Sequence, residues 1–246
     1  MSTVKEQLFF LMEHYHIGKK PLSKILGWGD TTIMRYLNGV EPNREFSIKI
    51  QQLVENPWEY VKILEQNKEH ITETAYKKTK KAVYQEILKD RSIEAMQYVI
   101  TLADADIAPY RVITVLYYAQ VCSLVFRGFP LIEEEADFSA TQTIVYPRLY
   151  HQMKQYGLHR LLPECSALSE EEHNYLKQVY SILNGYSPNA LKTLFIREKR
   201  RIRRRLGLEI TQIGQEVLTN QYEEMMKKTG INNVSDLKSY FAKVLK

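Results

Sequence analysis

The most apolar stretch of the sequence, residues 112–126, is interrupted by the polar residues Thr114, Gln120 and Ser123. It is too short and too polar to span a bilayer, and it suits a helix buried in a protein core. The 246-residue chain contains only 10 glycines and 8 prolines, so tight turns are few and long helices are favoured. We therefore expect a mainly α fold with at most a small β element near residues 131–145.

The two cysteines, Cys122 and Cys165, lie in no CxxC motif and in no cysteine–histidine cluster. Isolated thiols in a chain of this length indicate a reducing compartment, and neither a disulfide framework nor a zinc site. The N-terminal residues MSTVKEQLFF lack the basic segment and the long apolar run of a secretory signal peptide. We therefore expect a cytoplasmic protein with no membrane partner.

Residues 21–39, PLSKILGWGDTTIMRYLNG, combine two short helical patterns with a glycine-containing turn. Pro21 suits the first turn of the first helix. Asp30 is expected to be the N-cap of the second helix, because its carboxylate can accept a free backbone N–H and complements the helix dipole. Gly39 is expected to end that helix as a C′ glycine. This arrangement is a helix-turn-helix, and the segment resembles the repressor-type motif of phage and antitoxin regulators.

The second helix of this motif has two chemically different faces. Ile33, Tyr36 and Leu37 are spaced to lie inward. The opposite face suits a DNA major groove, because Arg can pair with guanine, Asn with adenine, and Thr can contact a thymine methyl group or a phosphate. It consists of Thr31, Arg35 and Asn38, with Thr32 and Met34 at its flanks. Further candidates, for phosphate contacts, lie close by: Lys19, Lys20, Lys24, Asn43 and Arg44.

Charge is distributed unevenly along the chain. Residues 1–90 hold 14 basic and 12 acidic groups, residues 91–196 hold 8 and 11, and residues 197–246 hold 12 and 6. This pattern argues against nucleic-acid binding along the whole surface, and a head so weakly basic needs a homodimer or a complex to bind operator DNA well. We divide the chain into a helix-turn-helix DNA-binding domain (1–66), a polar connecting helical linker (67–91) and a larger domain (92–246).

Three motifs in the larger domain carry a resemblance to a known family. They are residues 109–120 (PYRVITVLYYAQ), residues 145–157 (VYPRLYHQMKQYG) and residues 168–191, which begin LSEEE. Over residues 92–196 the sequence resembles the Panacea, or SocA-like, domain of antitoxins and phage-associated proteins. The resemblance implies a mostly helical domain that binds and neutralises a cognate protein toxin. Together with the helix-turn-helix, it makes an antitoxin that represses its own operon through residues 1–66 our leading hypothesis.

A helical body rich in tyrosine can present aromatic contact surface to a partner. The candidates for toxin contacts lie in the first two motifs: Tyr117, Tyr118, Tyr146, Tyr150 and Tyr156. Their alternative role is ordinary core and rim packing. Two other functions stay open: a prophage transcription regulator without a toxin partner, and an adaptor that delivers its partner to a protease.

Residues 197–205, REKRRIRRR, hold seven basic groups in nine positions. On a helix these positions surround every face, so Ile202 and the flanking Phe195, Ile196 and Leu206 are expected to anchor it. Arginine suits carboxylate and phosphate groups. The partner-binding candidates here are Arg200, Arg201 and Arg204. They suit an acidic face of the toxin, nucleic-acid phosphates or the internal Glu133–Glu135 run, and a solvated helix is the alternative.

No pattern of catalytic or metal-binding residues stands out. His14 and His16 are two positions apart, so they point in different directions on a helix and are poor joint ligands. The sequence contains no phosphate-binding glycine loop and no HExxH motif. We expect neither enzyme activity nor a cofactor.

Overall fold

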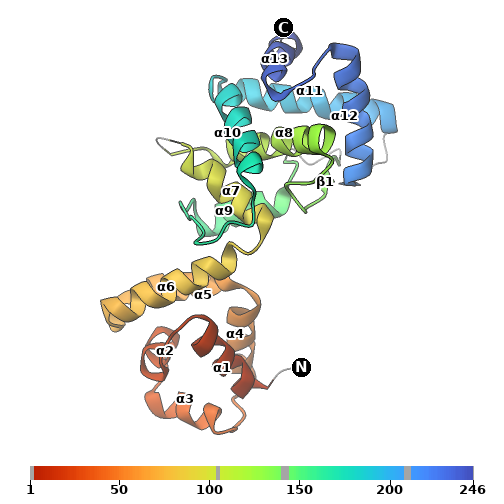
Figure 1. Cartoon of the computed structure of the whole chain (residues 1–246). Coiled ribbons are helices and arrows are strands. Elements are labelled where there is room, and N and C mark those ends of the chain that lie inside the picture. The colour runs from red at the N-terminus through yellow and green to blue at the C-terminus, as the bar shows by residue number, and fades with distance from the viewer. Residues whose placement is uncertain (1–2, 104–105, 140–143, 208–211, 246) are drawn as a thin grey trace. The chain divides into compact units, whose positions relative to one another are not determined.

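The computed structural model describes residues 3–103, 106–139, 144–207 and 212–245 (Figure 1). The chain divides into two compact units, Met1–Lys89 and Asp90–Lys246. Thirteen α-helices, two 3-10 helices and one two-stranded sheet make up the described secondary structure. The expected mainly α fold is thereby confirmed. One strand of the sheet lies within residues 131–145, where the β element was expected, and the other lies at residues 212–213. None of the helices in these ranges is long and apolar enough to cross a membrane.

The first unit is a helical bundle whose helix starts are set by local capping. Side chains of Thr3, Asn43, Asn56 and Thr72 each accept a backbone N–H at a helix start, and Pro57 occupies a first position where no N–H is needed. The elements are α1 (Val4–His14), α2 (Lys19–Leu26), α3 (Asp30–Leu37), α4 (Arg44–Glu55), α5 (Pro57–Gln66), η1 (Lys68–His70) and α6 (Glu73–Ile87).

Helix α6 occupies the segment that was expected to be a connecting linker. It packs against α5 and buries Thr79, Val83 and Ile87 at four-residue spacing. The hydroxyl oxygens of Tyr60 on α5 and Thr79 lie 3.1 Å apart in a buried hydrogen bond. The boundary between the units therefore falls after residue 89, and α6 belongs to the first unit. A narrow apolar stripe is enough to pair one helix with another, even where most of its residues are polar.

The second unit contains the remaining elements. They are α7 (Arg91–Thr101), α8 (Pro109–Arg127), β1 (Ala136–Asp137), α9 (Pro147–Tyr156), α10 (Glu170–Asn184), α11 (Pro188–Leu206), β2 (Gln212–Ile213), α12 (Gln215–Thr229), η2 (Val234–Asp236) and α13 (Leu237–Leu245). Helix α8 is central: α7, α9, α10, α11 and α12 all contact it (Figure 1). Every residue from Val112 to Leu124 is buried, as expected of a core helix.

A small antiparallel sheet and one buried amide hold the segment that follows α8. β1 pairs with β2 in the register Ala136 to Ile213 and Asp137 to Gln212. The Gln120 side chain donates to the carbonyl of Ile132 at 3.0 Å and accepts the backbone N–H groups of Leu131 and Ile132 at 2.6 and 2.8 Å. Because its oxygen and its nitrogen both have hydrogen-bond partners, Gln120 can lie inside a buried helix.

Candidate nucleic-acid interface

A three-residue turn, Gly27–Gly29, joins α2 to α3 in the predicted helix-turn-helix. Gly27 ends α2 with φ +72°, in the left-handed region that favours glycine, and the Trp28 N–H donates to the Ser23 carbonyl at 2.8 Å. Gly29 then precedes α3 with an extended backbone. Gly39, with φ +93°, follows the last residues of α3 as expected.

The role expected of Asp30 was wrong. The N-cap of α3 is Gly29, and Asp30 is the first residue of the helix. Its Oδ1 atom accepts a hydrogen bond of 2.5 Å from the hydroxyl of Ser23, a buried residue of α2. The carboxylate still lies in the first turn, where it complements the helix dipole. Its hydrogen bond joins the two helices of the motif.

The inner face of α3 lies as its spacing predicted. Ile33, Tyr36 and Leu37 are buried. An aromatic cluster fixes this face, because the Trp28 ring lies 4.6 Å from the ring of Phe46 on α4 and 5.8 Å from that of Tyr36. Ring pairs at these separations add directional packing to the apolar contact. The helix therefore has one rotational setting, which also decides what its other face presents.

The outer face of α3 presents the residues expected for base recognition. Thr31, Met34, Arg35 and Asn38 are exposed, and Thr32 is half-buried. Among the residues that the structure describes, no side-chain hydrogen bond or ion pair engages Arg35. Its guanidinium is therefore available for a bidentate contact with guanine.

The candidates for phosphate contacts are all exposed, at two helix starts. Lys19 and Lys20 occupy the first two positions of α2, Lys24 lies one turn later, and Arg44 is the first residue of α4. Asn43 has an additional local role, because its side-chain oxygen accepts the Phe46 N–H at 2.9 Å as the N-cap of α4. Its amide nitrogen is left for another acceptor.

Three of the tyrosines expected to contact a partner are inside the second unit. Tyr117 and Tyr118 are 0 % exposed and Tyr146 is 1 % exposed, so the prediction that they form a partner surface was wrong. For Tyr117 and Tyr118 the reason is the position of α8, which five helices contact, so its tyrosines point into the core whichever face they occupy. Tyr150 and Tyr156 on α9 are half-buried and keep part of their rings at the surface.

A buried carboxylate that the sequence did not single out joins three helices. Glu198 on α11 is 1 % exposed. It accepts a hydrogen bond of 2.8 Å from the Tyr222 hydroxyl on α12 and another from the Tyr240 hydroxyl on α13. The Tyr117 and Tyr222 hydroxyl oxygens lie 2.6 Å apart, and because Tyr222 donates to Glu198, Tyr117 donates to Tyr222. Burial, and then the Glu198 charge, raise the pKa of Tyr222 and keep it a donor.

Arg201, expected at the partner surface, belongs to the same cluster. It donates to Glu198 Oε2 at 2.8 Å, and its guanidinium lies 5.2 Å from the centre of the Tyr222 ring. The expected anchors of the basic run were incomplete for the same reason, because Glu198 and Lys199 are buried beside Ile202 and Phe195. A charged residue can face a core when its charge is paired.

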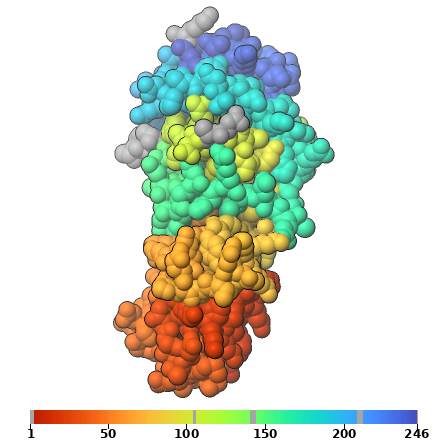
Figure 2. Space-filling view, turned by 90° about the vertical axis from the view of Figure 1, so that its left-hand side faces the viewer, coloured from red at the N-terminus to blue at the C-terminus, as the bar shows by residue number. Residues whose placement is uncertain are grey.

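Helix α11 reaches the surface, where it is light blue in Figure 2. The remaining members of the basic run are exposed or half-buried. Arg203 donates to the Phe138 carbonyl at 2.8 Å, Arg197 to the Val244 carbonyl, and Arg205 pairs with Glu224. Arg200 and Arg204 are exposed. No hydrogen bond or ion pair binds either of them to another described residue.

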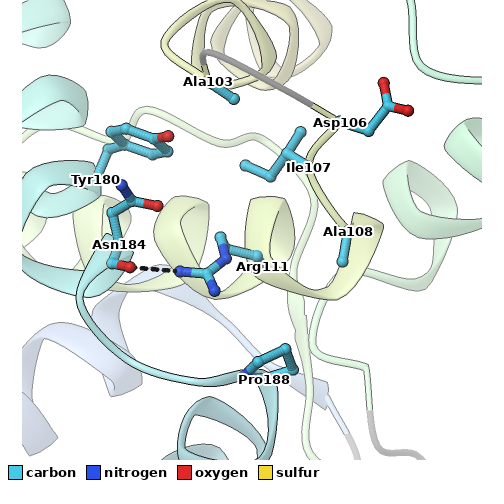
Figure 3. A pocket seen from close by; sticks show the side chains of 8 residues that line it. All are labelled: Ala103, Asp106, Ile107, Ala108, Arg111, Tyr180, Asn184 and Pro188. Atoms are coloured by element: carbon cyan, nitrogen blue, oxygen red, sulfur yellow. Dashed lines mark hydrogen bonds between the residues drawn. The ribbon is translucent and has the colours of Figure 1, made fainter.

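A pocket of about 380 Å³ opens beside the start of α8 (Figure 3). Its main charged group, Arg111, donates to the carbonyls of Leu183 and Asn184, both at 3.1 Å, and of Tyr186 at 2.9 Å. The guanidinium thereby neutralises the C-terminal end of α10. No group of His, Cys, Asp and Glu side chains within the described ranges is arranged to hold a metal ion.

Comparison of the chain with protein-family models, with curated proteins and with solved structures finds no match.

Proposed function

We propose that the protein is a DNA-binding regulator of the antitoxin type, which binds operator DNA through α3 and a cognate protein toxin through its second unit. The outer face of α3 carries the first half of this proposal. Arginine, asparagine and threonine side chains project together from a helix whose inner face is fixed by packing, and they lie on the motif's exposed side. That combination matches the way a recognition helix reads base edges.

The lysines of α2 add independent support. Cations at a helix N-terminus oppose the helix dipole and cost about 0.3–1 kcal/mol each. Lys19 and Lys20 occupy this position, the first turn of α2 contains no acidic residue, and the N-cap is a glycine with no side-chain hydrogen bond. The start of α2 therefore combines free backbone N–H groups with two positive charges, and this combination is suited to binding a phosphate.

The toxin-neutralising half of the proposal rests on the resemblance of residues 92–196 to the Panacea domain. The first of the resembling motifs lies in α8, so it concerns the core of the domain and not its contact surface. The contact is better sought on α9, where Tyr150 and Tyr156 are partly exposed, and at Leu162, which is 66 % exposed. Apolar side chains this exposed are suited to burial by a partner.

A gel mobility shift with the gene's own promoter tests the DNA-binding half. Replacing Arg35 by alanine should weaken specific binding by about 5- to 150-fold, since a bidentate base contact contributes about 1–3 kcal/mol of discrimination. Binding to unrelated duplex should change little. The matched control is Lys5→Ala, which removes an exposed positive charge from α1. Equal sequence preference in the wild type and Arg35→Ala would rule out base recognition by α3.

Co-expression with the product of the neighbouring gene tests the toxin-neutralising half. The expected result is a stable complex and rescue of growth, both weakened by Tyr150→Ala with Tyr156→Ala and kept by Lys154→Ala, an exposed position of the same helix. Operator binding without a complex or rescue would favour the plain transcription regulator. Loss of the partner only when a protease is present would favour the adaptor.

A further inference from the structure

Helix α11 carries an outward row of arginines that neither proposed contact uses. Arg197, Arg200 and Arg204 follow one another at spacings of three and four residues and are all exposed, and we call them the arginine face. The helix itself is held from the other side, because Leu194, Phe195 and Ile202 are buried. The face is therefore presented by a fixed support.

Little of the charge on this face is neutralised by the residues of the second unit that the structure describes. The acidic residue of the run, Glu198, is buried and already accepts from Arg201, Tyr222 and Tyr240. Glu224 is paired with Arg205 and Lys228. Arg200 and Arg204 have no acidic partner among the described residues.

The spacing suits the backbone of a nucleic acid. From Arg197 to Arg204 the helix axis advances about 10 Å at 1.5 Å per residue. One strand of duplex DNA presents a phosphate for about every 3.4 Å along its axis, so the face spans the rise of about three phosphates. Arginine forks bind phosphate oxygens through two parallel hydrogen bonds.

The distribution of charge favours DNA over an acidic protein as the occupant. Residues 1–90, which contain the helix-turn-helix, have a net charge of only +2 (14 basic and 12 acidic), whereas residues 197–246 have +6 (12 and 6). Affinity for DNA depends on the number of phosphates neutralised.

We propose that the arginine face of α11 binds the phosphate backbone of duplex DNA without regard to sequence. The choice of DNA as the partner rests on the proposed function of the helix-turn-helix. The face supplies salt-dependent affinity, and α3 supplies sequence preference. The two contacts are thus separable by mutation.

The experiment measures binding of the full chain to a fluorescent 20-base-pair duplex of random sequence between 50 and 200 mM salt. The variant is Arg200→Ala with Arg204→Ala, and the control is Lys177→Ala with Lys192→Ala, which removes the same charge from exposed positions. The variant should lower the slope of log affinity against log salt by about 1.8, or 0.9 for each lost phosphate contact. Between 50 and 200 mM salt, the factor by which the affinity falls should then be about 12 times smaller for the variant than for the wild type. The control should keep the wild-type slope.

An unchanged slope in the variant would overturn the proposal. So would loss of binding to poly-L-glutamate with an unchanged slope on the duplex, because that result assigns the face to an acidic protein. The two proposals fail in different ways. If the double arginine variant lowers the slope but Arg35→Ala keeps the sequence preference, only the helix-turn-helix proposal is refuted. If the slope is unchanged but Arg35→Ala loses the sequence preference, only the proposal for the arginine face is refuted.

Discussion

Replacing Glu198 by glutamine should destabilise the second unit by about 3 kcal/mol. The substitution keeps the size of the side chain but removes its charge, so the Arg201 guanidinium loses the carboxylate that lies 2.8 Å away. Breaking a buried ion pair costs about 3–5 kcal/mol, and the lower figure applies because the Arg201 side chain is 26 % exposed. For a unit of this size the loss corresponds to a fall of about 6–12 °C in the unfolding midpoint.

The same substitution at an exposed ion pair provides the control. Glu224→Gln removes a carboxylate that pairs with Arg205 and Lys228 at the surface, and it should leave the midpoint nearly unchanged. A second comparison removes both charges of the buried pair. Glu198→Gln with Arg201→Met should cost less than the sum of the two single substitutions, because neither buried charge is then left alone.

The chain contains separate reporters for its two units. Cys122 on α8 is buried, and burial raises the pKa of its thiol to about 12, so a thiol reagent at pH 8 labels it only when the second unit opens. The exposed Cys165 is replaced by serine for this assay. Both tryptophans, Trp28 and Trp58, lie in the first unit and report on it alone. If the reagent labels Cys122 of the Glu198→Gln variant at the same temperature as in the wild type, the Glu198 cluster does not stabilise the second unit and the reasoning is refuted.

Two further predictions concern the turn and the pH. Gly27→Ala should destabilise the first unit by about 1–2 kcal/mol in urea unfolding, because only the left-handed φ of +72° is strained and nothing lies within 4 Å of the added Cβ. Gly29→Ala should cost less, because its backbone is extended and the change only replaces a glycine at the N-cap of α3. Burial raises the pKa of Glu172, but a backbone N–H and the guanidinium groups of Arg127 and Arg91 outweigh it and lower that pKa. The stabilisation is present above the pKa that Glu172 has in the unfolded chain, and it is lost as the pH falls through the lower pKa that Glu172 has in the folded chain. Protection of Cys122 from the thiol reagent should therefore fall as the pH is lowered from about 5 to about 3, and it should fall less steeply in Glu172→Gln than in the wild type. An equally steep fall in the variant would contradict the ion pairs of Glu172 with Arg127 and Arg91.

The sequence predicted features that depend on near neighbours and missed those that depend on distant ones. The inner face of α3 follows from the spacing of Ile33, Tyr36 and Leu37, which a helix brings together wherever it lies. The hydrogen bond from Ser23 to Asp30 depends on the angle between two helices, and a good capping residue was therefore given the wrong role.

The second unit shows the same limit more strongly. Tyr117 and Tyr118 are suited equally to a core and to an interface, and only the covering of α8 by five helices decides between them. Glu198 meets Tyr222 and Tyr240 from 24 and 42 positions away. The one available signal was a single acidic residue within seven basic ones, and a solvated helix explains that pattern equally well.

The covering of α8 also sets an order for folding during synthesis. The contact of Tyr117 with Tyr222 spans 105 positions, whereas the first unit is complete by residue 89. At about 5–20 residues per second, roughly 6–23 seconds separate the end of α8 from the arrival of Phe241, whose ring packs on Tyr118. During that interval α8, the most apolar helix, is not yet packed against the C-terminal helices. The nascent protein is thus capable of folding its first unit while its second still needs protection from aggregation, and a chaperone that binds residues 112–124 would act in this interval.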